Sequence, residues 1–261
     1  MTAVQSIDSR PSAALTVEGL VKRFGARAVL DQVSIAVPAG ASVGLVGANG
    51  AGKTTLLKCV LDLCHPEAGR VSFFGQDGAR PASRRQLAYV PERFVPPHYL
   101  LGREFLQMTL SLAGEPYDDG RAREVLAELE LDSQALERPV RQLSKGMTQK
   151  LGLAGCFLQP RPLYLLDEPM SGLDPASRVA VKRVLARLHA AGSALFFTSH
   201  VLADVEELCS TIAVLERGRL HFQGTPAQLR ERHGGASLEQ AFLHCIRAPA
   251  PEPGHAAAAS A

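Results

Sequence analysis

The chain has 261 residues, enough for one large domain or two interlocked ones with a buried core. Apolar residues make up 46% of it and charged residues 21%, which excludes a wholly disordered or fibrous chain. The formal net charge is +2, so no strong electrostatic attraction to nucleic acid or to an anionic membrane is expected.

The cysteines and the apolar runs indicate in which cellular compartment the protein is expected. The five cysteines are odd in number and include no CxxC pair, which argues against a disulfide framework. Cys64 and His65 are neighbours, but the spacing of a four-ligand metal site is absent. The first residues lack the apolar core of a secretory signal, and no apolar run approaches the ~20 residues that span a bilayer. The sequence predicts a cytoplasmic protein without direct membrane insertion, whose membrane role, if any, needs a separate partner chain.

The first part of the chain is predicted to form strands and one helix. Residues 1–14 are polar or small and are expected to form a flexible N-terminus. A glycine-rich turn precedes Thr54–Cys64, where apolar residues at helical spacing predict a helix. The strands predicted in this part lie within Leu15–Val37 and at Ser42–Val46, Arg70–Gly75 and Leu87–Val90.

The strand-rich part of the chain is followed by a stretch of helices alone, after which strands and helices alternate again. Leu100–Leu158 holds three helical stretches with almost no strand signal, which indicates a helical insertion over about residues 96–158. Apolar strands follow at Leu163–Leu166 and Ser193–Thr198, with a helix between them over Pro175–Ala191 that has Asp174 as its N-cap. Apolar strands that alternate with helices predict an α/β fold with a buried, mostly parallel sheet. Residues 248–261 are of low complexity and are expected to be a disordered tail.

The strongest local signal is a complete phosphate-binding loop of the form G-x-x-x-x-G-K-[ST] between a predicted strand and a predicted helix. Its glycines let backbone N–H groups surround phosphate oxygens, and the positive end of the following helix faces the same anion. Lys53 would contact the β- and γ-phosphates, and the Thr54 hydroxyl would ligate Mg²⁺. The predicted nucleotide-binding residues are Gly47, Ala48, Asn49, Gly50, Ala51, Gly52, Lys53, Thr54 and Thr55.

Two acids and a histidine follow the later apolar strands. Asp167 and Glu168 come directly after Leu163–Leu166, so Asp167 would hold Mg²⁺ and Glu168 would polarise the attacking water. The alternative is a strand that ends in a solvated acidic turn. His200 follows the next apolar strand, where it would sense the γ-phosphate; the alternative is a structural histidine.

These residues together resemble the ATP-binding subunit of an ABC transporter over about Leu15 to Gly224. The specific mark is Leu143-Ser144-Lys145-Gly146-Met147, similar to the family signature that usually reads LSGGQ. The segments Asp167-Glu168-Pro169, Ser171-Gly172-Leu173-Asp174-Pro175 and Thr198-Ser199-His200 resemble the family's other landmarks. Lys145 and Met147 depart from the signature, and Glu92 stands where the family has a glutamine; both variations are frequent in the exporter branch.

The resemblance implies a P-loop NTPase core with an N-terminal antiparallel β subdomain and an inserted helical subdomain. The ABC ATPase domain would cover residues 15–224, followed by a C-terminal helical segment over residues 225–247. ATP and Mg²⁺ are the implied cofactors. Phe24 would stack on adenine unless it is a core aromatic, and Glu92 would join Thr54 and Asp167 at the metal.

The resemblance also implies partners. The signature residues Ser144 and Gly146 of one subunit would cover the ATP bound by a second ATPase subunit in a homodimer. That dimer would power a transmembrane permease, with export favoured over import, from the inner face of the cell membrane. The alternatives are a soluble ABC-type ATPase that acts on a non-transport assembly, and a module that binds ATP without turnover.

Overall fold

Two sheets and eight helices make up the part of the chain that the computed structural model describes, residues 13–249. The larger sheet has the strand order β10-β9-β3-β8-β7-β6, and its strands β3, β6, β7, β8 and β9 run parallel. Their bounds are β3 Ser42–Val46, β6 Leu87–Val90, β7 Leu163–Leu166, β8 Ala194–Ser199, β9 Thr211–Glu216 and β10 Arg219–Gly224. This is the mostly parallel α/β core that the sequence predicts.

The central strands are apolar along their whole length because both faces of the sheet are covered. Every residue of β3, β7 and β8 is buried. Alternate residues of β8 belong to different clusters: Leu195 and Phe197 pack on one side of the sheet, Ala194 and Phe196 on the other. Strand positions near the site are therefore held from two sides.

The smaller sheet is antiparallel and confirms the N-terminal β subdomain. Its order is β2-β1-β4-β5, with bounds β1 Ala13–Phe24, β2 Arg27–Pro38, β4 Ala68–Phe73 and β5 Gln76–Asp77. Strand β1 covers the last two residues of the expected flexible segment, Ala13 and Ala14, and Ala14 is fully buried. The rest of the expected flexible N-terminus, residues 1–12, lies outside the described residues.

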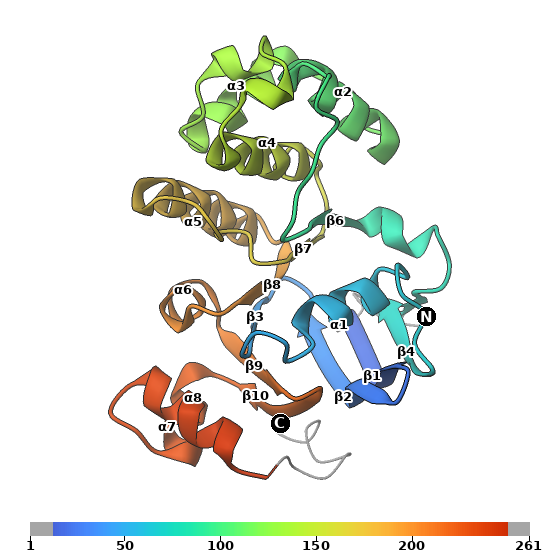
Figure 1. Cartoon of the computed structure of the whole chain (residues 1–261), viewed down its shortest axis with the longest axis vertical. Helices are drawn as coiled ribbons and strands as arrows, with labels where there is room; N and C mark the ends of the chain where they lie inside the picture. The colour runs from blue at the N-terminus through green and yellow to red at the C-terminus, as the bar shows by residue number, and fades with distance from the viewer. Residues whose placement is uncertain (1–12, 250–261) are drawn as a thin grey trace, which may run out of the picture.

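The helices form three groups along the molecule (Figure 1). The insertion, α2 to α4, lies at one end, α7 and α8 lie at the opposite end, and α1, α5 and α6 lie nearer the sheets. The helix bounds are α1 Lys53–Val60, α2 Gly102–Ala113, α3 Asp119–Glu128, α4 Lys145–Phe157, α5 Pro175–Ala190, α6 Leu202–Leu208, α7 Pro226–His233 and α8 Leu238–Arg247. The three predicted helical stretches of the insertion are thus present. Of the expected disordered tail, residues 250–261 lie outside the described residues.

Helix α1 corrects one prediction, because it ends at Val60 and not at Cys64. Asp62 adopts a left-handed conformation (φ 60°), the N–H of Leu63 donates to the carbonyl of Lys58 at 2.9 Å, and the N–H of Asp62 donates to that of Cys59 at 3.1 Å. These two bonds form a Schellman motif, which stops the helix. Cys64 therefore lies beyond the helix.

Candidate nucleotide site

Three chain segments meet at the carboxyl ends of adjacent parallel strands. Strand β3 leads into the phosphate loop, β7 leads into Asp167 and Glu168, and β8 leads into His200. Strand β8 pairs with both of the others, with Val46 beside Ser199 and Leu166 beside Phe197. Residues 100 or more positions apart in the sequence are brought together in this way, at the edge where open α/β sheets bind ligands.

The phosphate loop is shaped around Lys53. The Lys53 ammonium donates to the carbonyl of Gly47 at 2.7 Å, and its side chain is 7% exposed. A Cβ at Gly47 would lie 2.2 Å from the carbonyl oxygen of Leu215, so only glycine fits there. Gly52 precedes α1 with φ 112°, a conformation that glycine adopts without strain. Helix α1 therefore begins with its free N–H groups at the loop, the usual form of a phosphate site.

Thr198 connects the two acids. Its hydroxyl donates to Asp167 Oδ1 at 2.7 Å and accepts the backbone N–H of Glu168 at 2.8 Å. Asp167 is fully buried, and its Oδ2 has no hydrogen-bond partner among the described residues. Burial raises the pKa of Asp167, and the nearby Glu168 adds to this, while Thr198, Thr54 and Lys53 act in the opposite direction. A buried carboxylate oxygen without a partner, beside the Thr54 hydroxyl, fits a magnesium ion.

Glu168 joins the phosphate loop to the third strand. Its Oε1 lies 3.5 Å from Lys53 Nζ and its Oε2 lies 2.8 Å from His200 Nδ1. Glu168 has φ 47°, a left-handed conformation that costs a residue with a side chain of the order of 1 kcal/mol. The Glu168 carboxylate is 9% exposed, whereas the His200 ring is 54% exposed. The carboxylate is thus fixed from two sides at the floor of the site.

A cavity of about 600 Å³ lies above these residues. It is lined by Phe24, Arg27, Val29, Ala48, Asn49, Gly50, Gly52, Lys53, Thr54, Thr55, Glu92, Glu168, Ser171 and His200. Phe24 is 56% exposed, so the alternative that it belongs to the core is wrong. The Lys22 ammonium lies 5.1 Å from the centre of the Phe24 ring. The cavity therefore holds an exposed aromatic face, the phosphate loop and the acid–histidine pair together.

The structure does not bring all the predicted residues to this cavity. Gly47, Ala51 and Asp167 are absent from its lining. Ser144 and Gly146 belong to the insertion, where the Ser144 hydroxyl accepts the N–H of Met147 at 3.2 Å as the N-cap of α4. A Cβ at Gly146 would meet nothing within 4 Å, so the start of α4 is open to an approaching molecule.

Sequence reasoning gave no individual role to three residues that the geometry singles out. Thr198 bridges the acids, Arg27 adds a cation to the cavity, and Ser171 lines it from the loop after Glu168. The only available signal for Thr198 was its membership of the Thr198-Ser199-His200 segment. Arg27 could have been noticed as a basic residue close to Phe24 across the Gly25 turn.

This fold and this arrangement of loops define a P-loop nucleotide-binding domain. A family model described as ABC transporter matches residues 30–171, more than half of the chain. The chain belongs to the ABC transporter family.

Relatives and solved structures agree with this assignment. The chain is 39% identical over 204 residues to an ABC transporter ATP-binding protein of Synechocystis sp., covering 77% of this chain and 57% of that protein. It is 34% identical to the Nod factor export ATP-binding protein I of Ralstonia nicotianae (87% and 72% covered). It is 33% identical to the daunorubicin/doxorubicin resistance ATP-binding protein of Streptomyces peucetius (89% and 71% covered). The chain spans about 60% of the length of the first two curated relatives that it matches.

A solved ATP-binding subunit of an ABC transporter superposes with a TM-score of 0.80 at 33% identity, covering 89% of this chain and 99% of that one. A dimeric bacterial ABC transporter cassette superposes with a TM-score of 0.74 at 21% identity, covering 81% and 98%, and this likeness concerns the fold alone. Over residues 13–249, no helix combines the length and the apolar character needed to cross a membrane.

Proposed function

We propose that the chain hydrolyses Mg-ATP and thereby powers a separate transmembrane permease, as an exporter subunit. The observation that carries the proposal is the Glu168 carboxylate, fixed between Lys53 Nζ and His200 Nδ1 at the floor of a cavity that the phosphate loop lines. A carboxylate held there accepts a proton from the attacking water, while Lys53 balances the charge of the phosphates.

Magnesium would be held by Thr54 and Asp167, with Glu92 at the cavity wall as a further oxygen ligand. The metal supplies charge neutralisation at the β- and γ-phosphates. The residues of this chain would supply the other roles. The Phe24 ring would stack on the base, Thr198 would orient both acids, and His200 would hold the Glu168 carboxylate toward the γ-phosphate position.

A second copy of the chain completes the proposed site. Ser144 and Gly146 are absent from the nucleotide cavity of their own chain, and α4 begins with an open face. The N-terminus of α4 in one copy would therefore cap the ATP that its twin holds. ATP then stabilises the closed dimer, and hydrolysis removes the contacts that hold the dimer closed. The segment Tyr89–Arg93 and the insertion would pass this motion to the permease.

Phosphate release by the purified chain with Mg-ATP tests the ATPase activity, and extraction of the tagged chain from membranes in mild detergent tests the permease. We expect phosphate release that needs Mg²⁺ and recovery of an integral membrane protein. Tight ATP binding without phosphate release would indicate a module that binds ATP without hydrolysing it. If the chain hydrolyses ATP but does not co-purify with a membrane protein, it would be the ATPase of a soluble assembly.

A further inference from the structure

A buried acid joins α6 to α5 close to the nucleotide site. Asp204, in the first turn of α6, is 3% exposed and contacts two cations of α5. Arg178 Nη2 donates to Asp204 Oδ2, and Lys182 Nζ lies 2.9 Å from Asp204 Oδ1. The two cations are four residues apart, so they lie on the same face of α5. Asp204 is thus held at both carboxylate oxygens by one neighbouring helix.

The Lys182 ammonium keeps its charge in this position. Burial by itself would lower the pKa of Lys182, but hydrogen bonds with Glu207 and Asp204 outweigh it, so the pKa of Lys182 is raised. The Glu207 side chain is 60% exposed, and its contact with Lys182 therefore lies at the surface. Of the two acids that Lys182 meets, only Asp204 is cut off from water.

The ion pairs connect two segments that both lead away from the nucleotide site. Helix α5 begins directly after the loop that carries Ser171, and α6 begins two residues after His200. The two helices lie side by side (Figure 1). One small cavity is lined both by the acid–histidine pair of the site and by two of the residues described above, Arg178 and Asp204. The ion pairs therefore lie next to the contact between His200 and Glu168.

The His200 ring depends on its backbone for its position. The ring is 54% exposed, and its contact with Glu168 Oε2, 2.8 Å from Nδ1, is its only hydrogen bond within residues 13–249. The backbone after the ring turns at Ser199, whose hydroxyl accepts the N–H of Val201 at 3.0 Å, and then enters α6. Helix α6 has no side-chain cap at its N-terminus, so the link to α5 through Asp204 is what fixes its first turn.

We propose that Asp204 is a positioning residue for the ATPase reaction: its ion pairs with Arg178 and Lys182 fix the start of α6 and thereby hold His200 against Glu168. The proposal rests on the proposed function and adds to it a residue outside the nucleotide cavity. A buried ion pair contributes little net stability, because the cost of removing the charges from water offsets their attraction. It does define a geometry, because two cations of one helix must meet one acid of the other.

Phosphate release by variants of the full-length chain tests the proposal. Asp204→Asn keeps the size of the side chain and removes its charge. We expect kcat for Mg-ATP to fall by roughly tenfold or more with KM unchanged, because the phosphate loop is untouched and only the reacting geometry is disturbed. Asp204→Glu keeps the charge and is expected to recover most of this loss. Glu207→Gln, which removes the exposed partner of Lys182, is the matched control and should leave kcat unchanged. Equal kcat values for Asp204→Asn and Glu207→Gln overturn the proposal.

A double-mutant cycle separates positioning from a general structural role. If Asp204 acts through His200, Asp204→Asn causes no further loss of kcat in a chain that already carries His200→Ala. Losses that multiply in the double variant overturn the proposal. Arg178→Gln is the second variant should Asp204→Asn fail to fold, because the Arg178 side chain is 29% exposed and Lys182 remains to pair with Asp204. It is expected to lower kcat in the same direction by a smaller factor, and an unchanged kcat counts against the proposal.

The His200 ring gives a readout that needs no hydrolysis. Above the ordinary histidine pKa of about 6.5, nitrogen chemical shifts in NMR report which ring nitrogen carries the proton, and His200→Ala assigns the signals. The contact with Glu168 is expected to keep the proton on Nδ1 in the unmodified chain and in Glu207→Gln. In Asp204→Asn the shifts are expected to move toward those of a free imidazole, and unchanged shifts overturn the proposal. Absence of phosphate release from an unmodified chain that shows these ring shifts refutes the ATPase activity alone.

Discussion

Replacing Thr198 with valine tests whether one hydroxyl holds the two acids of the site in place. The Thr198 hydroxyl donates to Asp167 Oδ1 at 2.7 Å, accepts the N–H of Glu168 at 2.8 Å, and is fully buried. A hydrogen bond to a charged group contributes about 1.5–3 kcal/mol and a neutral one about 0.5–1.5 kcal/mol. Valine keeps the shape of the side chain but forms neither bond. We therefore expect the free energy of unfolding to fall by about 2–4 kcal/mol.

Urea unfolding of the nucleotide-free chain, followed by circular dichroism, measures this loss. Thr198→Ser is the matched control, because it keeps the hydroxyl and removes one buried methyl group at a cost of about 1 kcal/mol. We also expect phosphate release to fall in the valine variant and to persist in the serine variant, since only serine orients Asp167 and Glu168. A valine variant as stable and as active as the serine variant would refute the bridging role.

Three further substitutions probe the same site. Glu168→Gln should retain ATP binding, slow phosphate release by at least ~10²-fold and accumulate an ATP-bound dimer on size-exclusion chromatography; normal turnover would remove Glu168 from its role. Lys53→Ala should weaken Mg-ATP binding in isothermal titration calorimetry, and unchanged affinity would contradict the phosphate-loop geometry. Burial raises the pKa of Asp167, so the native state loses stability as pH rises from the usual Asp range through that raised pKa. Asp167→Asn should therefore raise the melting temperature at pH 7 without Mg²⁺ while abolishing hydrolysis, and a lower melting temperature would count against a buried unpaired charge.

The sheet and the phosphate loop could be predicted because local sequence determines them. Strands β3, β7 and β8 are continuous apolar runs, and such runs occur where both faces of a sheet are covered. The loop needs glycines at Gly47 and Gly52 for reasons of space and backbone conformation that hold wherever the loop occurs. In both cases the residue type follows directly from the structure at that position. Strands covered on both faces need apolar side chains, and the loop needs residues without a Cβ.

The end of α1 could not be predicted, because its stop signal is conformational. Apolar residues continue at helical spacing as far as Cys64, but Asp62 takes the left-handed conformation that usually marks a glycine. The Thr198 bridge was missed for a different reason. It exists because β7 and β8 are paired with Leu166 beside Phe197, which places the hydroxyl between two acids some 30 residues earlier in the chain. The sequence of either strand alone does not determine which residues of the two strands pair with each other.

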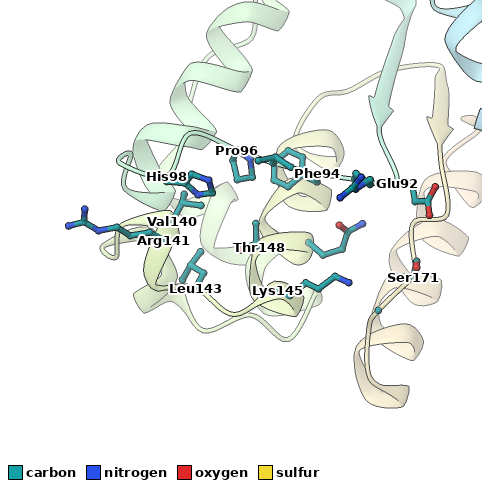
Figure 2. A pocket seen from close by; sticks show the side chains of 14 residues that line it. Glu92, Phe94, Pro96, His98, Val140, Arg141, Leu143, Lys145, Thr148 and Ser171 are labelled. Atoms are coloured by element: carbon teal, nitrogen blue, oxygen red, sulfur yellow. The ribbon is translucent and has the colours of Figure 1, made fainter.

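The nucleotide cavity and a second cavity of about 540 Å³, between the insertion and the core, share two lining residues, Glu92 and Ser171 (Figure 2). The Glu92 carboxylate on that shared wall adds a negative charge to both cavities, and it acts on charges that lie within the Debye length of about 8 Å at physiological salt. A charged ligand in either cavity would therefore interact with the same carboxylate, and any coupling of the two binding free energies through it would be reciprocal. A glutamine at this position would keep the shape of the wall without the charge. We expect the carboxylate at residue 92 to add an electrostatic contribution to both cavities that a neutral side chain cannot provide.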